Sequence, residues 1–198
     1  NAAAHYLHNL YFMLGSSMKE AALPVEMQVS AARANRIENY DTICIKAKMK
    51  RGVELLYIAS HAVDETQNPL IEYRFENAVI RYDCNTNYLT AYFNDGSTKK
   101  YGEVDADVHT KLEAVIDGVR NGNYENTVYC TPSTCKPHVW TVDQIYRNEE
   151  IFQFPAEKIQ VYRPEDAQAK GVFVAGLREA CKKAYEEETF LDFSKLFQ

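Results

Sequence analysis

The segment 41-DTICIKAKMKRGVELLYIASH-61 decides the fold of this 198-residue chain. In its first half apolar and polar residues alternate, which is typical of a half-buried β-strand. One face carries Ile43, Ile45, Ala47 and Met49, and the other carries Thr42, Lys46, Lys48 and Lys50. Arg51-Gly52 then marks a tight turn, and 53-VELLYIASH-61 continues as a second strand. The segment therefore predicts a β-hairpin.

Further strands are predicted on both sides of this hairpin. Before it, Val25, Met27 and Val29 alternate with polar residues, and Pro24 ends any preceding helix. After it come short runs rich in β-branched and aromatic residues, namely 70-LIEYRFE-76, 78-AVIRYD-83, 88-YLTAYF-93 and 97-STKKYG-102. Consecutive strands joined by short turns predict one mainly antiparallel sheet.

Helical patterns occupy the two ends of the chain. One helix is predicted within residues 1–15 and ends at Gly15. Three more follow the strands, at 105–122, from Ser133 or Thr134 to before Pro155, and at about 165–188. This order predicts a single α+β domain over residues 1–198, an open, mainly antiparallel sheet with helices packed on one face. The open face would carry several tyrosines, which favours a homo-oligomer through that face.

The composition excludes several classes of protein. The net charge is −6 and no basic stripe is present, so neither nucleic acid nor an anionic membrane is an expected partner. No apolar run reaches the length of a membrane span. The closest of the five cysteines, Cys130 and Cys135, have no second pair, so we expect neither a disulfide framework nor a metal site. A soluble protein of the cytoplasm is the resulting expectation.

The first helix, 1-NAAAHYLHNLYFMLG-15, carries an unusual polar stripe. At about 100° per residue, Asn1, His5, His8 and Phe12 fall within an arc of about 60°. The apolar residues Leu7, Leu10, Tyr11 and Leu14 lie on the opposite side. Imidazoles bind ligands and transfer protons near neutral pH, but both histidines can equally be satisfied by hydrogen bonds where two elements pack.

Other polar residues lie where predicted strands end. Arg33 and Asn35, in the loop 32-ARANRIEN-39, can hold a polyhydroxylated or acidic ligand, or can serve the turn itself. His61 ends the second hairpin strand, where a sheet meets its loops. His5, His8 and His61 can also be considered as metal ligands, although their spacing matches no known ligand set.

The stretch 1–15 resembles the segment that opens the C-terminal domain of the Gfo/Idh/MocA oxidoreductases, the family of glucose–fructose oxidoreductase and inositol dehydrogenase. There, an acidic residue precedes a histidine by four positions, and an apolar helix ending in glycine follows. The segments 38–62, 93–102, 111–122 and 137–151 continue the order of that family. The resemblance covers nearly the whole chain.

The resemblance implies an N-terminal Rossmann domain that binds NAD or NADP and a C-terminal α+β domain of the dihydrodipicolinate reductase type. The active site lies between the two domains, and the substrate is a sugar or cyclitol. His5 matches the acid/base group at the carbinol that is oxidised, while the cofactor takes the hydride. Asn1, His8, Arg33, Asn35 and His61 would line the substrate side. The helix at about 165–188 would face the N-terminal domain.

Two departures from the family pattern limit the chemistry. Asn1 stands where many relatives have aspartate, so it can orient a hydroxyl but cannot accept a proton. The eight glycines form no GxGxxG motif, and the Rossmann domain with its catalytic lysine is absent. The chain is therefore expected to be the substrate-binding and oligomerisation half of the enzyme, inactive alone. The alternatives are a non-catalytic sugar or nucleotide sensor or dimerisation module of the same fold, and a metal-dependent hydrolase using the three histidines.

Overall fold

The computed structural model describes residues 5–103, 108–148, 150–162 and 171–197. The chain forms two compact units, one made of Asn1–Glu65 and Val128–Gln198 and the other of Thr66–Thr127. Asn1, one of the predicted substrate residues, lies outside the described residues. Each unit is described by itself below.

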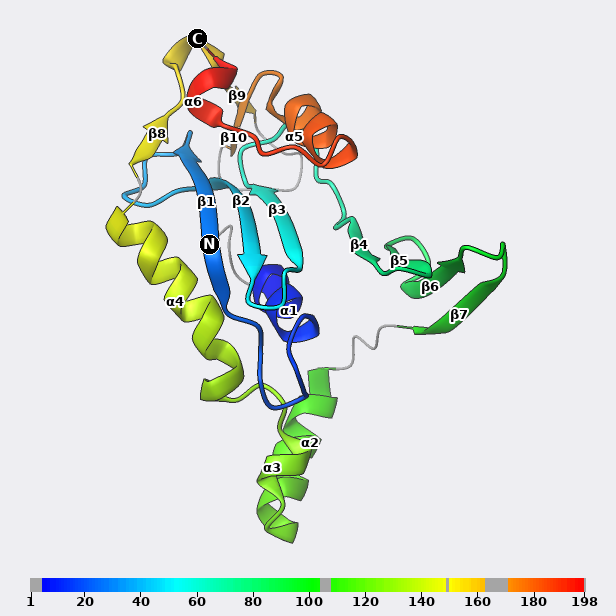
Figure 1. Ribbon diagram of the computed structural model, residues 1–198. Coiled ribbons are helices and arrows are strands. Elements are labelled where there is room, and N and C mark those ends of the chain that lie inside the picture. Colours follow the sequence, from blue (N-terminus) through cyan, green and yellow to red (C-terminus); the bar gives the residue numbers. More distant parts are fainter. Residues whose placement is uncertain (1–4, 104–107, 149, 163–170, 198) are drawn as a thin grey trace. The chain divides into compact units, whose positions relative to one another are not determined.

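The first unit is built on the predicted hairpin. Strands β2 (Thr42–Met49) and β3 (Glu54–Ser60) pair antiparallel, with Thr42 opposite Ser60. Gly52 adopts a φ of 82° in the turn, a left-handed conformation that favours glycine. Strand β1 (Pro24–Arg33) pairs antiparallel with β2, and the short strand β8 (Ile151–Gln153) pairs parallel with β1. The sheet order is β3-β2-β1-β8 (Figure 1).

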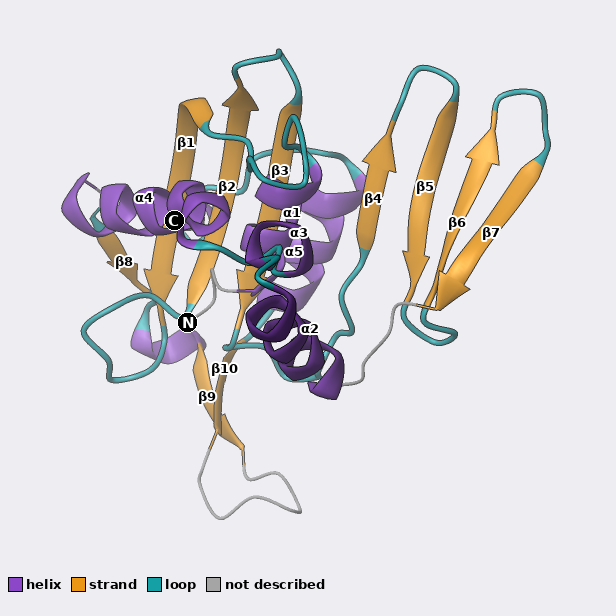
Figure 2. Cartoon of the chain, turned by 90° about the horizontal axis from the view of Figure 1, so that it is seen from below, coloured by secondary structure: helices purple, strands orange, loops and turns teal. Residues whose placement is uncertain are grey.

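One face of this sheet packs against two helices, α1 (His5–Met13) and α4 (Pro132–Asn148). All four residues predicted to point inward from β2 are buried in this core, namely Ile43, Ile45, Ala47 and Met49. Leu7 and Tyr11 from α1 and Ile145 from α4 complete it. Figure 2 shows α4 lying across strands β1 and β2. The two helices also contact each other, so α1 is held by both the sheet and α4.

The opposite face of the sheet carries a second, smaller core at one end. It includes Ala32 and Cys44 from the sheet and residues from α5 (Leu177–Glu186) and α6 (Phe193–Leu196). Phe154 lies between these elements, with its ring edge-on to Phe193 at a centroid distance of 5.9 Å. The predicted α+β class with an open, mainly antiparallel sheet is confirmed. The prediction that the helices pack on one face is wrong, since α5 and α6 pack on the face opposite α1 and α4.

The helix predicted over about 165–188 is wrong in its first part. Residues Gly171–Val174 form strand β10, which pairs antiparallel with β9 (Ile159–Tyr162) after a short 3₁₀ turn, η1 (Ala156–Lys158). Helix α5 begins only at Leu177, because Gly176 adopts a φ of 80° that no right-handed helix contains. Val172, Phe173 and Val174 are also better strand than helix formers. Residues 163–170 lie outside the described part.

The second unit contains the remaining strands. β4 (Ile71–Arg74), β5 (Ala78–Asp83), β6 (Tyr88–Phe93) and β7 (Thr98–Glu103) form a separate antiparallel sheet in chain order. The prediction of one continuous sheet is therefore wrong, since the link 61–70, which contains Pro69, forms no strand. The unit also holds α2 (Val108–Asn121), which ends at Gly122 as predicted, and α3 (Tyr124–Thr127).

The aromatic residues predicted for an open sheet face are divided between the units. Tyr57 is buried in the core under α1, whereas Tyr73, Tyr82, Tyr88 and Tyr92 lie in the second sheet. Assembly into a homo-oligomer stays a prediction. Within the described ranges, no helix combines the length and the apolar character needed to cross a bilayer.

Candidate functional site

Helix α1 presents its histidines on the side away from the core. Leu7 and Tyr11 are fully buried beneath the helix, while His5 is exposed and His8 is half-buried. This is the division between a polar stripe and an apolar face that the helical projection predicts. Because burial of Leu7 and Tyr11 fixes the rotation of α1, the imidazole of His5 is held at the surface by a rigid element.

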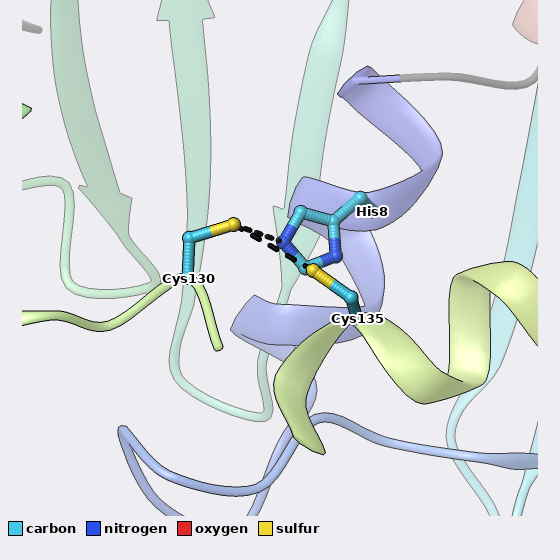
Figure 3. Close-up of side chains that lie close together, drawn as sticks. All are labelled: His8, Cys130 and Cys135. Carbon is cyan, nitrogen blue, oxygen red and sulfur yellow. Dashed lines mark hydrogen bonds between the residues drawn. The ribbon is translucent and has the colours of Figure 1, made fainter. Parts of the chain in front are cut away.

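His8 lies in a cluster that joins α1 to the start of α4. Its Nε2 atom is 3.8 Å from the Sγ atom of Cys130, and this sulfur is 3.6 Å from the Sγ atom of Cys135 (Figure 3). The ring of His138 lies edge-on to the ring of His8, with centroids 6.1 Å apart. The sequence prediction did not connect these residues, because His8 is 122 positions from Cys130 along the chain.

Burial lowers the pKa of His8, and the neighbouring His138 and His5 lower it further by charge repulsion. The imidazole is therefore neutral at neutral pH. Its Nδ1 atom is buried and has no hydrogen-bond partner among the described residues. A half-buried neutral imidazole with one unsatisfied nitrogen has a lone pair with which it can act as a ligand.

A second group of predicted residues meets at the end of β1. The carboxylate of Asp41, which is 5% exposed, accepts hydrogen bonds from the backbone nitrogens of Ala34 and Asn35. It also accepts from the side-chain amide of Asn35 at 2.8 Å and from the hydroxyl of Thr42 at 3.0 Å. Asp41 thus fixes the loop, and Asn35 contributes to that structure. In the sequence, the feature that indicates this role of Asp41 is its position directly before strand β2.

Arg33 is also engaged within the protein. Its Nε atom donates to Gln153 at 3.0 Å, and its Nη1 atom donates to the carbonyl oxygens of Ile37 and Glu38. The sequence leaves open whether Arg33 and Asn35 hold a ligand or stabilise the turn. The structure favours stabilisation of the turn. Their contact with a substrate stays a prediction.

His61 lies at the same end of the sheet. Its ring is exposed, and its backbone nitrogen donates to the carbonyl oxygen of Asp41 at 2.9 Å. His61 is thereby connected to the loop of Arg33 and Asn35. Within the part of the chain that the structure describes, no hydrogen bond links this loop group to His5 or His8.

The metal set considered from the sequence, His5, His8 and His61, is not brought together. In the described residues, the group of at least three potential metal ligands is His8, Cys130 and Cys135. The structure therefore does not support a metal-dependent hydrolase that uses these three histidines as ligands.

The fold of this chain is similar to part of several solved structures. No protein-family model and no curated protein matches the sequence. Two crystal forms of UDP-N-acetylglucosamine 3-dehydrogenase GnnA from Acidithiobacillus ferrooxidans are similar in structure, with a TM-score of 0.52 and 15% sequence identity. The similarity covers 63% and 62% of this chain and 39% of the dehydrogenase.

A third solved structure is an oxidoreductase from Agrobacterium radiobacter in complex with NAD+, L-tartaric acid and magnesium. It matches at 13% identity over 62% of this chain and 41% of that one, with a TM-score of 0.46. The chain thus spans about two fifths of the length of the structures it matches. At such identities the likeness establishes the fold alone. Over 63% of its length the chain shares the α+β fold of part of UDP-N-acetylglucosamine 3-dehydrogenase, as the resemblance to the Gfo/Idh/MocA oxidoreductases implies.

Proposed function

We propose that this chain is the substrate-binding and oligomerisation part of an NAD(P)-dependent oxidoreductase. Its reaction would be the oxidation of a carbinol, or the reduction of the matching carbonyl, on a sugar or cyclitol. The observation that carries the proposal is the fold shared with a sugar-nucleotide dehydrogenase over 63% of the chain. The position of His5 on the exposed side of α1 supports it.

His5 takes the role of acid and base in this proposal. An imidazole can accept the hydroxyl proton while a carbinol is oxidised and can return it during reduction. The ring of His5 is exposed, and the helix beneath it is fixed through Leu7 and Tyr11. A group that must meet a substrate atom within hydrogen-bond distance benefits from such a rigid support.

The substrate hydroxyls would meet polar groups near the sheet end. His61 offers an exposed imidazole there, and Asn1, His8, Arg33 and Asn35 are the other predicted substrate contacts. Neutral polyhydroxylated ligands are recognised by such mixed amide, imidazole and guanidinium groups.

The residues of this chain do not fit a dinucleotide. Its eight glycines form no GxGxxG motif. A dinucleotide-binding fold holds the phosphates at a glycine-rich turn between a parallel strand and the following helix. In the described ranges the parallel strands β1 and β8 have no such turn. NAD or NADP would accordingly be held by a separate N-terminal Rossmann domain, and this chain would supply the proton transfer and the substrate contacts.

The test is a turnover assay on the full gene product that contains residues 1–198. NAD(P)H formation is followed with a panel of nucleotide sugars, aldoses and inositols, for the wild type, His5→Ala and the matched control His109→Ala. His109 is an exposed histidine of helix α2. We expect His5→Ala to lower kcat by about 10²- to 10⁴-fold with the control unchanged.

Two results would contradict the proposal. Equal turnover of His5→Ala and the wild type would remove His5 from the chemistry. Sugar binding with no turnover on any member of the panel would favour the non-catalytic sensor instead.

A further inference from the structure

Three side chains that can bind a metal ion converge between α1 and the start of α4. His8 comes from α1, Cys135 from the first turn of α4, and Cys130 from the segment just before that helix. One ligand atom of each residue lies within 4.8 Å of the others. Figure 3 shows both sulfur atoms directed toward the imidazole.

Two of the three ligand–ligand distances in this cluster are close to those of a tetrahedral zinc site. With zinc–sulfur bonds of about 2.3 Å and zinc–nitrogen bonds of about 2.05 Å, ideal tetrahedral angles separate two sulfurs by about 3.8 Å. They separate a sulfur from a nitrogen by about 3.6 Å. The observed separations are 3.6 Å between the sulfurs and 3.8 Å between Cys130 Sγ and His8 Nε2. A disulfide would instead require about 2.05 Å between the sulfurs.

The chemistry of the donors also fits zinc. Two thiolates and an imidazole form a borderline-soft set, which favours zinc over magnesium or calcium. The buried Nδ1 atom of His8 has no hydrogen-bond partner among the described residues, which is a costly state for a polar atom. With zinc bound at Nε2, Nδ1 is the nitrogen that carries the proton of the neutral ring, so the site rests on the geometry of Nε2 and the two sulfurs.

His138 lies beside the cluster, although it is outside the group of three residues whose ligand atoms lie within 4.8 Å of one another. It follows Cys135 by three positions on α4, so the two side chains project from the same face of the helix. Its ring is edge-on to that of His8, with centroids 6.1 Å apart. The two cysteines and His138 form the spacing Cys-x4-Cys-x2-His, and α1 supplies the remaining histidine.

We propose that His8, Cys130, Cys135 and His138 bind one structural Zn²⁺ ion that fastens α1 to α4. Binding releases the two thiol protons and leaves both imidazoles neutral. The proposal moves His8 from the substrate side to the metal. It leaves the role of His5 in the oxidoreductase proposal unchanged, and the ion would also fix the helix that carries His5.

The test is metal binding by the 198-residue chain, reduced and stripped of metal with a chelator. It is titrated with ZnCl2 in competition with a chromophoric chelator, and separately with CoCl2. We expect one zinc per chain and, with cobalt, a thiolate charge-transfer band together with intense visible bands of a tetrahedral ion. Cys130→Ser, Cys135→Ser and His8→Ala should each weaken zinc binding by at least about 100-fold, and His138→Ala by about 10- to 100-fold.

Cys84→Ser is the matched control, because Cys84 is a partly exposed cysteine in the second unit. It should bind zinc as the wild type does. Cys130 is exposed, so Cys130→Ser is expected to fold, and its far-ultraviolet circular dichroism verifies this.

Several outcomes would overturn the zinc site. These are no stoichiometric zinc binding, unchanged affinity in both Cys130→Ser and Cys135→Ser, or equal weakening in Cys84→Ser. A chain that joins Cys130 to Cys135 in a disulfide and binds no zinc once reduced would also overturn it. Unchanged affinity in His138→Ala would remove that residue from the ligand set.

Discussion

The hydrogen bond between Tyr11 and Thr141 offers a sharp test of how α1 is held in place. The Tyr11 hydroxyl lies 3.0 Å from the Thr141 hydroxyl, across the contact between α1 and α4. Both side chains are 0% exposed, so bulk water cannot replace either partner. Burial also raises the pKa of Tyr11, so its hydroxyl stays protonated and can donate.

The cost of breaking this bond follows from burial. Tyr11→Phe leaves the Thr141 hydroxyl without a partner, and Thr141→Val leaves the Tyr11 hydroxyl without one. Each single change should lower the free energy of unfolding by about 1–3 kcal/mol. The double variant removes both polar groups at nearly constant shape. It should therefore lose clearly less than the sum of the single changes, with a coupling of about 1 kcal/mol or more.

Urea unfolding followed by tryptophan fluorescence measures this cycle. Trp140 is the single tryptophan and neighbours Thr141 on α4, so it reports on the unit that contains the bond. Tyr6→Phe, an exposed tyrosine on the same helix, is the control and should stay within about 0.5 kcal/mol of the wild type. Single variants as stable as the wild type, or strictly additive losses, would show that the Tyr11–Thr141 hydrogen bond does not stabilise the fold.

Three further predictions concern charged and thiol groups. Asp41→Asn should lower the free energy of unfolding by about 1.5–3 kcal/mol in the same assay, because the carboxylate accepts several buried hydrogen bonds; an unchanged urea midpoint would contradict this. Burial raises the pKa of Cys44 to about 11 and of Cys181 to about 12, so at pH 8 iodoacetamide should alkylate both at least about 100-fold more slowly in the folded chain than in urea. Peptide mass spectrometry checks this, and equal rates would contradict it. The Ser194 hydroxyl holds the pKa of Asp192 below its usual range, so its carboxylate stabilises the fold above a pH of about 4, and this contribution is lost as the pH falls through the folded-state pKa. Asp192→Asn should flatten the acid limb of the stability curve, and an unaltered limb would show that the carboxylate contributes nothing.

The sequence predicts the parts of the fold that local patterns determine. The alternation of Ile43, Ile45, Ala47 and Met49 needs only one buried face, and all four lie in the core beside α1. The division of α1 into an apolar face with Leu7 and a polar stripe with His5 follows in the same way from helical periodicity.

Pairings between distant segments were missed because no local pattern encodes them. Strand β8 has three residues, and Gln153 pairs with Arg33, 120 positions earlier. The predicted start of the last long helix near residue 165 is wrong because Gly176, directly before α5, adopts a left-handed conformation. The helical pattern of the sequence does not reveal this conformation.

In the candidate site, too, the features set by local sequence patterns could be predicted, whereas those set by the packing of distant segments could not. The exposure of His5 follows from the helical projection, whereas the group of His8, Cys130 and Cys135 depends on the packing of α1 against α4. The engagement of Asn35 by Asp41 depends likewise on the closed shape of the loop after β1.

Chemical rescue of His5→Ala by imidazole tests most directly whether His5 is the acid/base group of an oxidoreductase. The full gene product that contains this chain is assayed for NAD(P)H formation with its best substrate, with and without added imidazole. We expect that His5→Ala loses most of its kcat and that imidazole restores turnover in proportion to its neutral form, while His109→Ala keeps the wild-type kcat with and without imidazole. Full turnover of His5→Ala without imidazole would contradict it.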